Sequence, residues 1–136
     1  MGGGGGDMDW SGGTARPAVA AGMRCQIDIN GAGGFGWRLV APNGRSVAVS
    51  LTSQDTHDRC RAAFVRLCAE HGEIGGGVQH STEGGWVWLA WDTAGRHVAG
   101  SARTYERHAT CRAAYDRFRA LLPELVGAGP ELWGET

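Results

Sequence analysis

Residues 33–69 read GGFGWRLVAPNGRSVAVSLTSQDTHDRCRAAFVRLCA, and a second version of this stretch begins 51 residues further along the chain. Placed without a gap on residues 84–120, the stretch is identical at 15 of 37 positions. The identical residues include Trp37 with Trp88, Ser50 with Ser101, His57 with His108 and Cys60 with Cys111. Self-similarity of this extent indicates a tandem duplication.

The hydrophobic pattern changes period in the same way within each copy. Alternation at residues 23–29, 35–41 and 46–51 predicts three strands, with a tight turn at Pro42–Arg45. Apolar residues then follow at steps of three and four, which predicts a helix that Ser53 or Asp55 caps and Gly72 ends. The second copy repeats the plan with strands at 75–81, 86–91 and 96–101 and a helix from about 106 to the region of Pro123. The chain is therefore expected to be an α+β domain of two tandem βββα repeats.

The flanks differ in composition from the duplicated body. Residues 1–22 are mostly glycine, alanine and small polar residues, and residues 126–136 again contain glycine and proline. We therefore expect a flexible glycine-rich leader over 1–22, with Trp10 as its one possible anchor, and a flexible tail over 126–136. The duplicated domain would span 23–125, with a first unit at 23–72 and a second unit at 73–125.

Charge and cysteine content favour a cytoplasmic protein. Residues 24–119 hold 12 Arg against 9 acidic side chains, a difference of +3, which is too small to require a polyanionic partner. The N-terminus lacks the basic and apolar regions of a signal peptide, and no apolar run is long enough to cross a membrane. The four cysteines are then expected to be reduced thiols.

Two short patterns have counterparts in a known family. The first is LVAPNGR at residues 39–45 with Ser50 following, and the second is Ala63-Phe64 with Leu67, which returns as Ala114-Tyr115 with Phe118. With these patterns the chain resembles, over roughly residues 24–122, the YegP-like domains, a small bacterial family of unknown function. The resemblance implies one antiparallel sheet with two helices packed on one face, each helix lying across the other unit's strands. It supplies no catalytic residue.

The paired His-x-x-Cys motifs are the clearest candidates for chemistry. A spacing of three places His57 and Cys60 on one helix face, and His108 and Cys111 repeat the arrangement. Two such pairs brought together could form a tetrahedral zinc site or a thiol site. The simpler interpretation is that both cysteines pack against the sheet and that the duplication copied inert residues together.

Other patterns give no support for catalysis. The stretch at residues 31–36 matches G-x-G-x-x-G, but a strand follows it, whereas a phosphate-binding loop leads into a helix. The acidic residues at 28, 73, 83 and 92 fall at strand ends and turns, where they are usually solvated. We therefore expect a protein that is not an enzyme, with no cofactor and no evident small-molecule substrate.

The aromatic residues of the predicted strands favour an interaction module. A sheet with helices on one face leaves its other face open, and the strand at 86–91 is apolar on both faces. Burial of an exposed Trp on association could contribute roughly 2–3 kcal/mol. We therefore predict that a protein partner, or a second copy of the chain, binds the open face through Trp37, Trp86, Trp88 and Trp91.

Single-stranded nucleic acid is an alternative ligand for the same face. Bases would stack on the aromatic residues, and phosphates would bind Arg38, Arg45, Arg96 and Arg103. The weak net charge and the acidic ends of the chain argue against this alternative.

Overall fold

The computed structural model describes residues 21–134, so the predicted leader and Trp10 lie outside the described part except for residues 21 and 22. The elements follow in the order β1 (Arg24–Ile29), β2 (Phe35–Val40), β3 (Ser46–Ser50), α1 (His57–Ala69), β4 (Gly75–His80), β5 (Trp86–Trp91), β6 (His97–Gly100), α2 (His108–Leu125) and the short 3₁₀ helix η2 (Pro130–Trp133). This is the α+β order that the hydrophobic pattern predicts.

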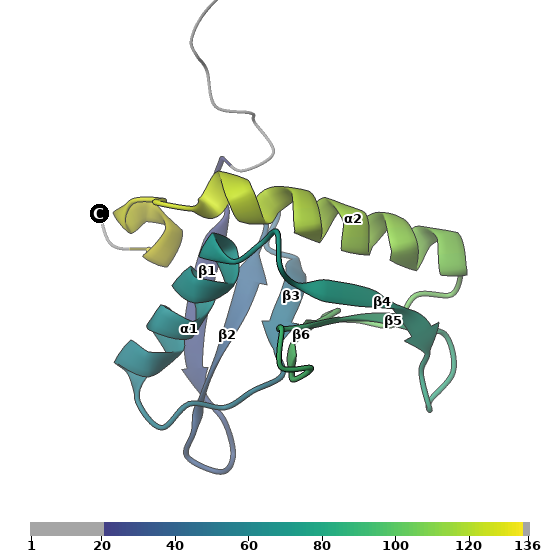
Figure 1. The fold of residues 1–136 in the computed structure, drawn as a ribbon, viewed down its shortest axis with the longest axis horizontal. Coiled ribbons are helices and arrows are strands. Elements are labelled where there is room, and N and C mark those ends of the chain that lie inside the picture. The colour runs from purple at the N-terminus through teal and green to yellow at the C-terminus, as the bar shows by residue number, and fades with distance from the viewer. Residues whose placement is uncertain (1–20, 135–136) are drawn as a thin grey trace, which may run out of the picture.

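All six strands form one antiparallel sheet in the order β1-β2-β3-β6-β5-β4. Each unit contributes a three-stranded meander, and the two meanders meet where β3 pairs with β6. Only two residue pairs are made there, Val49 with Gly100 and Ser50 with Ala99. In Figure 1 the strands of the two meanders run in clearly different directions, so the sheet bends strongly at this junction.

Equivalent turns are built from different side chains in the two units. Gly44 and Gly95 both have a positive φ, 85° and 81°, which suits glycine because it has no Cβ. In the first turn the Asn43 side chain accepts a hydrogen bond from the Arg45 backbone N–H at 2.9 Å. In the second turn the Asp92 carboxylate accepts from Arg96 and from residue 94, each at 3.0 Å, and these N–H groups lower the pKa of Asp92. The Asp92 carboxylate thus takes the role that the Asn43 side chain has in the first turn.

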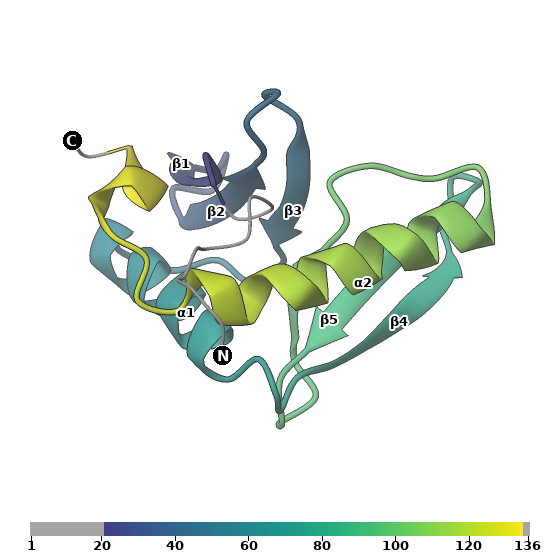
Figure 2. The same ribbon diagram turned by 90° about the horizontal axis from the view of Figure 1, so that it is seen from above.

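Each helix covers the sheet of its own unit. The Trp37 and Phe64 rings meet at 4.8 Å between β2 and α1, and the Trp88 and Phe118 rings stack at 4.7 Å between β5 and α2. In Figure 2, α1 lies beside the first meander while the longer α2 extends over β4 and β5. The crossing of helices between units that the family resemblance implies is therefore not found in this structure.

The helix ends differ from those expected. The N-cap of α1 is Thr56, whose hydroxyl accepts a hydrogen bond from the Arg59 N–H at 3.0 Å, and not Ser53 or Asp55. Ser53 instead accepts a hydrogen bond from the Asn30 side chain at 2.9 Å, so it closes a loop contact. The helix ends at Ala69, before Gly72. Pro123 lies in the last turn of α2.

The end of the described chain folds back onto the first unit, although residues 126–136 were expected to be a flexible tail. Leu132 is 4% exposed, and the Trp133 ring lies 5.9 Å from the Phe64 ring. The Arg61 guanidinium lies over the Trp133 ring, 4.5 Å from the ring centre. A single Leu-Trp pair is enough to anchor the segment because it extends an existing aromatic cluster.

Two serine hydroxyls hold the sheet at the bend. The Ser50 hydroxyl accepts a hydrogen bond from the Trp37 N–H at 3.0 Å, and the Ser101 hydroxyl accepts from the Trp88 N–H at 3.3 Å. In both cases the hydroxyl accepts the hydrogen bond that a backbone carbonyl would otherwise accept, at the end of β3 for Ser50 and directly after β6 for Ser101. The serine of the family motif therefore has a structural role.

We predict that Ser50→Ala lowers the free energy of unfolding by about 1–3 kcal/mol, because it leaves the part-buried Trp37 N–H without a partner. Urea titration followed by tryptophan fluorescence measures this change. Ser46→Ala is the control, since the Ser46 hydroxyl makes no hydrogen bond in the described part of the chain. Equal stability of the two variants would contradict the proposed role of Ser50.

Candidate interaction surface

The open face of the second unit carries an apolar patch. Strand alternation places Val87, Leu89 and Trp91 of β5 on the side away from the helices, and none of them belongs to the buried core. Val49 of β3 and Leu51, which directly follows β3, continue the surface across the bend. The side chain of Leu51 lies over Gly100, the residue that faces both Val49 and Leu89. We refer to these five residues, Val49, Leu51, Val87, Leu89 and Trp91, as the open-face patch.

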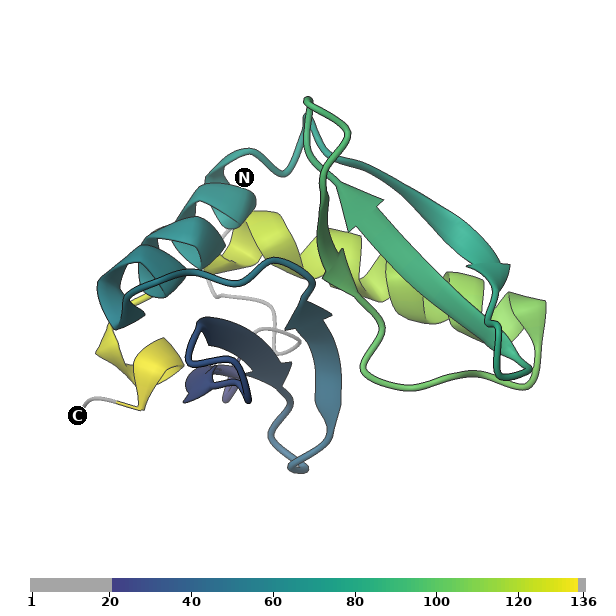
Figure 3. The same ribbon diagram turned by 90° about the horizontal axis from the view of Figure 1, so that it is seen from below.

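Exposure and glycine make this patch accessible. Trp91 is 36% exposed and Leu51 is 44% exposed, and the other three side chains are half-buried. Trp91 lies against Gly75, and a Cβ at Gly77 would meet no atom within 4 Å. Figure 3 shows β5 and β6 in front of α2, so this view looks onto the side that the helix leaves open.

The open face of the first unit is polar instead. Arg24, Gln26 and Asp28 of β1 and Arg38 of β2 project from it. The Arg38 guanidinium donates a hydrogen bond to the Gln26 side chain at 2.7 Å and lies 3.8 Å from the Asp28 carboxylate. These groups stay hydrated and satisfy each other, so the β1 side of this face is polar, whereas Val49 of β3 belongs to the open-face patch.

Comparison of equivalent positions shows that the two units differ in polarity on this face. At the 51-residue offset, Arg38 corresponds to Leu89, and Arg24 and Gln26 correspond to Gly75 and Gly77. On the covered face, in contrast, Trp37 corresponds to Trp88. The second unit thus has apolar or bare positions where the first unit has charged and polar ones.

The predicted partner-binding tryptophans do not share one surface. Trp37 and Trp88 are 4% and 0% exposed and lie between the sheet and the helices, so neither can contact a partner. Trp86 is half-buried on the same covered face, between the His80 and His108 rings. Trp91 alone of the four lies on the open face. Of these four tryptophans, Trp91 is therefore the one that could stack on a nucleic-acid base at the open face.

The structure does not assemble the paired His-x-x-Cys motifs into a metal site. His57 and Cys60 lie on α1 over the first meander, and His108 and Cys111 lie on α2 over the second. Within residues 21–134 no three His, Cys, Asp or Glu side chains group as metal ligands. The zinc alternative therefore has no site in this part of the protein.

Packing explains the repeated histidines. The His57 ring meets the Phe35 ring edge-on at 6.2 Å, and the His108 ring meets Trp86, the equivalent of Phe35, edge-on at 4.8 Å. Each histidine begins a helix and contacts the aromatic residue that begins the middle strand of its unit. The two units therefore share this contact between helix and strand.

Burial makes the four thiols poor nucleophiles. Cys25, Cys60, Cys68 and Cys111 are all free and buried. Burial raises the pKa of Cys60 and of Cys111, and it raises the pKa of Cys68 to about 12. Burial also raises the pKa of Cys25, and the neighbouring Cys68 and Cys60 thiols raise this pKa further. A thiolate is the reactive form, so these side chains favour core packing over catalysis.

Two further sequence features have clear structural outcomes. The G-x-G-x-x-G stretch at residues 31–36 spans the β1–β2 turn and the start of β2, and no helix follows it directly. Among residues 21–134, neither helix combines the length and the apolar character needed to cross a membrane.

No protein-family model matches the chain, and no curated protein sequence matches it. Two solution NMR structures share its architecture: YegP from E. coli, a protein of unknown function, and a UPF0339 protein from Shewanella oneidensis. YegP aligns over 75% of this chain and 87% of its own, with a TM-score of 0.57 and 10% identity. The UPF0339 protein aligns over 74% and 85%, with a TM-score of 0.59 and 9% identity.

The chain has the YegP fold. At 9–10% identity the likeness is one of fold alone. It confirms the fold that the resemblance in the hairpin and helix motifs predicts. The YegP fold gives the backbone that positions the open-face patch, but it does not say what the patch binds.

We predict that the buried thiols make stability fall in alkaline solution. The pKa of Cys68 is about 12 when folded and about 9.0 when exposed, so its contribution is complete below pH 9 and is lost as pH rises toward 12. Urea titrations at pH 8, 9 and 10 should show a slope of up to about 1.4 kcal/mol per pH unit from this thiol. Cys68→Ala should be less stable at pH 8 but lose less stability above pH 9. An unchanged slope would contradict the burial of Cys68.

Proposed function

We propose that the protein is a non-catalytic interaction module that binds a protein partner through the open-face patch, and that in its simplest form the partner is a second copy of the chain. The supporting observation is the contrast between equivalent positions of the two units. The same backbone presents Arg38 in one unit and Leu89 in the other. The fold therefore does not require an apolar residue there, and the apolar patch needs another explanation.

The chemistry of the patch suits association. Trp91 and Leu51 are large and partly exposed, and their side chains lie over the glycine backbone at Gly75 and Gly100, while the space beside Gly77 is open. A partner can approach the backbone at Gly77 closely and cover the exposed part of the aromatic ring. Full burial of an exposed apolar side chain contributes about 1.5–3 kcal/mol, and covering the parts of Trp91 and Leu89 that are still exposed would contribute a fraction of this for each.

The absence of catalytic function is part of the same proposal. The buried thiols have raised pKa values, and the histidines of the helix starts contact aromatic rings. These observations favour packing roles for the residue types that most often act as nucleophile and base. A cytoplasmic location, expected from the sequence, remains a prediction.

We predict that Leu89→Arg weakens self-association by at least about tenfold, because a charged side chain would have to lose its hydration in the interface. Sedimentation velocity over a range of protein concentrations measures the change. The variant is expected to fold, since the first unit carries Arg38 at the equivalent position. Val65→Arg is the control, because Val65 is 52% exposed on α1, away from the patch.

The outcomes separate the alternatives clearly. Wild-type dimers that Leu89→Arg dissociates and Val65→Arg preserves would support the proposal. A wild-type protein that stays monomeric up to about 1 mM would overturn self-association. Dimers that both variants leave intact would overturn the patch as the interface.

A further inference from the structure

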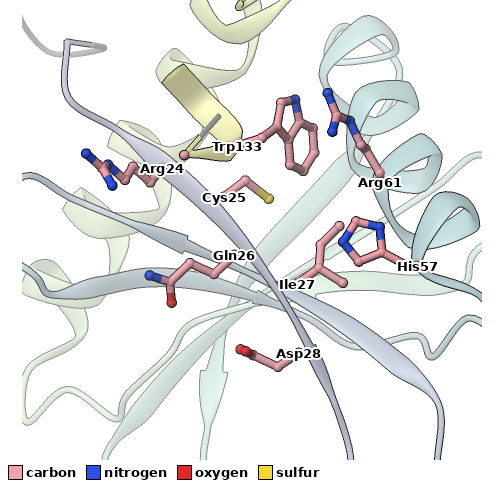
Figure 4. Close-up of a pocket in the computed structure, with 9 residues that line it drawn as sticks. Arg24, Cys25, Gln26, Ile27, Asp28, His57, Arg61 and Trp133 are labelled. Atoms are coloured by element: carbon pink, nitrogen blue, oxygen red, sulfur yellow. The ribbon is translucent and has the colours of Figure 1, made fainter. Parts of the chain in front are cut away.

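The two edges of the sheet, β1 and β4, differ in how far the rest of the chain covers them. At β1 the short helix η2 packs against the strand, and Cys25 is 2% exposed. Figure 4 shows the Trp133 ring and the His57 ring on the same side of β1 as Cys25 and Ile27. A groove of about 350 Å³ remains between these elements. Because so little of Cys25 is exposed, its main chain is buried as well, and this edge is closed there.

The edge at β4 is open. Gly76 and Val78 are half-buried, and His80 is exposed. Glycine has no side chain, so the exposed part of Gly76 is main chain. In Figure 2 and Figure 3, β4 forms the outer margin of the second unit, and α2 lies over the sheet rather than beside this strand. The main chain of β4 is therefore accessible along its outer side.

Half of the backbone groups of β4 point to this free edge. The Ser81 N–H donates to the Gly85 carbonyl at 2.9 Å and so closes the β4–β5 hairpin. Hydrogen bonding alternates along an antiparallel pair, so the groups directed toward β5 belong to residues 75, 77 and 79. Residues 76, 78 and 80 therefore direct their N–H and C=O groups outward. Within residues 21–134 no backbone hydrogen bond outside the β4–β5 pairing reaches them.

β4 has none of the features that usually protect an edge strand. Its sequence, GGGVQH, contains no Arg, Lys, Asp, Glu or Pro, and its pairing with β5 runs without a register shift. Natural proteins usually place a charge, a proline or a bulge on an exposed edge, because unpaired edges attract other strands. A Cβ at Gly77 would moreover meet no atom within 4 Å. This edge therefore favours pairing with another extended strand.

The strand is complementary to a second copy of itself. In an antiparallel pair centred on Val78, that residue faces Val78 of the second copy, and Gly76 faces His80 in both directions. All the outward groups are then paired, by about six hydrogen bonds. On the open face, Gln79 of each copy lies opposite the empty space at Gly77 of the other. A register shifted by two residues leaves Gly76 or His80 beyond the end of the other strand.

A positive charge lies at the Gly76 end of this edge. The Arg119 guanidinium donates hydrogen bonds to the Tyr115 hydroxyl at 3.0 Å and to the His71 carbonyl at 3.3 Å. The Tyr115 hydroxyl packs against Gly76, so the guanidinium lies beside the start of β4. Both acceptors are neutral, and within residues 21–134 no carboxylate forms an ion pair with Arg119.

A negative charge lies at the other end of the edge. Glu83 is exposed in the turn that follows His80, and it forms no ion pair with the residues that the structure describes. In an antiparallel pair, the start of one strand lies beside the end of the other, so Arg119 of each copy lies toward Glu83 of the other. Glu73 also lies near the start of β4 and offsets part of this attraction, so backbone pairing remains the larger contribution.

We propose that the free edge of β4 pairs antiparallel with β4 of a second copy, centred on Val78, and joins two six-stranded sheets into one. This inference goes beyond the proposed function and does not rest on it. Both open-face patches stay uncovered in such a pair, on the same side of the joined sheet, where they remain accessible to another protein.

Sedimentation velocity of the full chain at concentrations up to about 1 mM tests the pairing. We expect a concentration-dependent dimer in the wild type. Val78→Pro removes an N–H that points outward without removing a hydrogen bond to β5, and it should weaken the dimer by at least about tenfold. Ile27→Pro is the matched control, because Ile27 holds the equivalent place on β1, and it should leave the dimer unchanged.

Paired charges test the register. Gly77 and Gln79 lie opposite each other across the proposed pair, on the open face. Gly77→Lys with Gln79→Glu places opposite charges there and should tighten the dimer by about fivefold. Gly77→Glu with Gln79→Glu places like charges there and should weaken the dimer by a similar factor. Both double variants should fold, since the first unit carries Gln26 at the position of Gly77.

The same measurements separate the edge from the open-face patch. Dimers that Val78→Pro dissociates, and that Ile27→Pro and Leu89→Arg preserve, would support the edge pair. Dimers that Val78→Pro leaves intact, or that both charge variants weaken alike, would overturn it, and Leu89→Arg would then show whether the patch forms those dimers. A wild-type chain that stays monomeric at about 1 mM would also overturn the edge pair, while the patch could still bind a different protein.

Discussion

The structure depends on the short junction between β3 and β6. Two residue pairs join the meanders, and the Ser50 and Ser101 hydroxyls take over the hydrogen bonds that a longer ladder would have made. Because the sheet bends there, the two meanders run in different directions, and a helix aligned with one cannot follow the strands of the other. Each helix consequently covers its own unit. The longer α2 also contacts β3 and α1, so it is the element that braces the bend.

The two units both have an apolar covered face, but they differ in the polarity of the open face. Trp37 and Trp88 occupy equivalent buried positions, but their surroundings are adjusted in pairs. Where the first unit has Phe64 and Cys25, the second has the larger Tyr115 against the smaller Gly76. Such paired changes conserve volume, which a close-packed core requires. The open face has no such requirement, so the change from Arg38 to Leu89 needs no compensating change beneath it.

The sequence predicts the strands and helices well because each segment follows either the two-residue period of a strand or the 3.6-residue period of a helix. The strand at Trp86–Trp91 has the predicted bounds, and both helices carry the predicted cysteine and aromatic residues on the buried face. The choice of surface residues failed at Trp37 and Trp88, since alternation separates two faces but does not say which face the helices cover. Trp86–Trp91 is apolar on both faces, so the strand alone could not decide. The sequence already contains a signal that marks the open side, which is the difference between Arg38 and Leu89 at equivalent positions.

Two further differences from the sequence-based expectation lie at the N-cap of α1 and in the segment after α2. Thr56 caps α1 in place of Ser53, because the Ser53 hydroxyl accepts a hydrogen bond from the Asn30 side chain. The short helix η2 packs on the first unit because Trp133 contacts Phe64 and Arg61. Both depend on contacts between residues far apart in the chain, which periodicity does not report. The same contacts line a groove beside β1, since η2 supplies its Trp133 wall and α1 supplies His57 and Arg61.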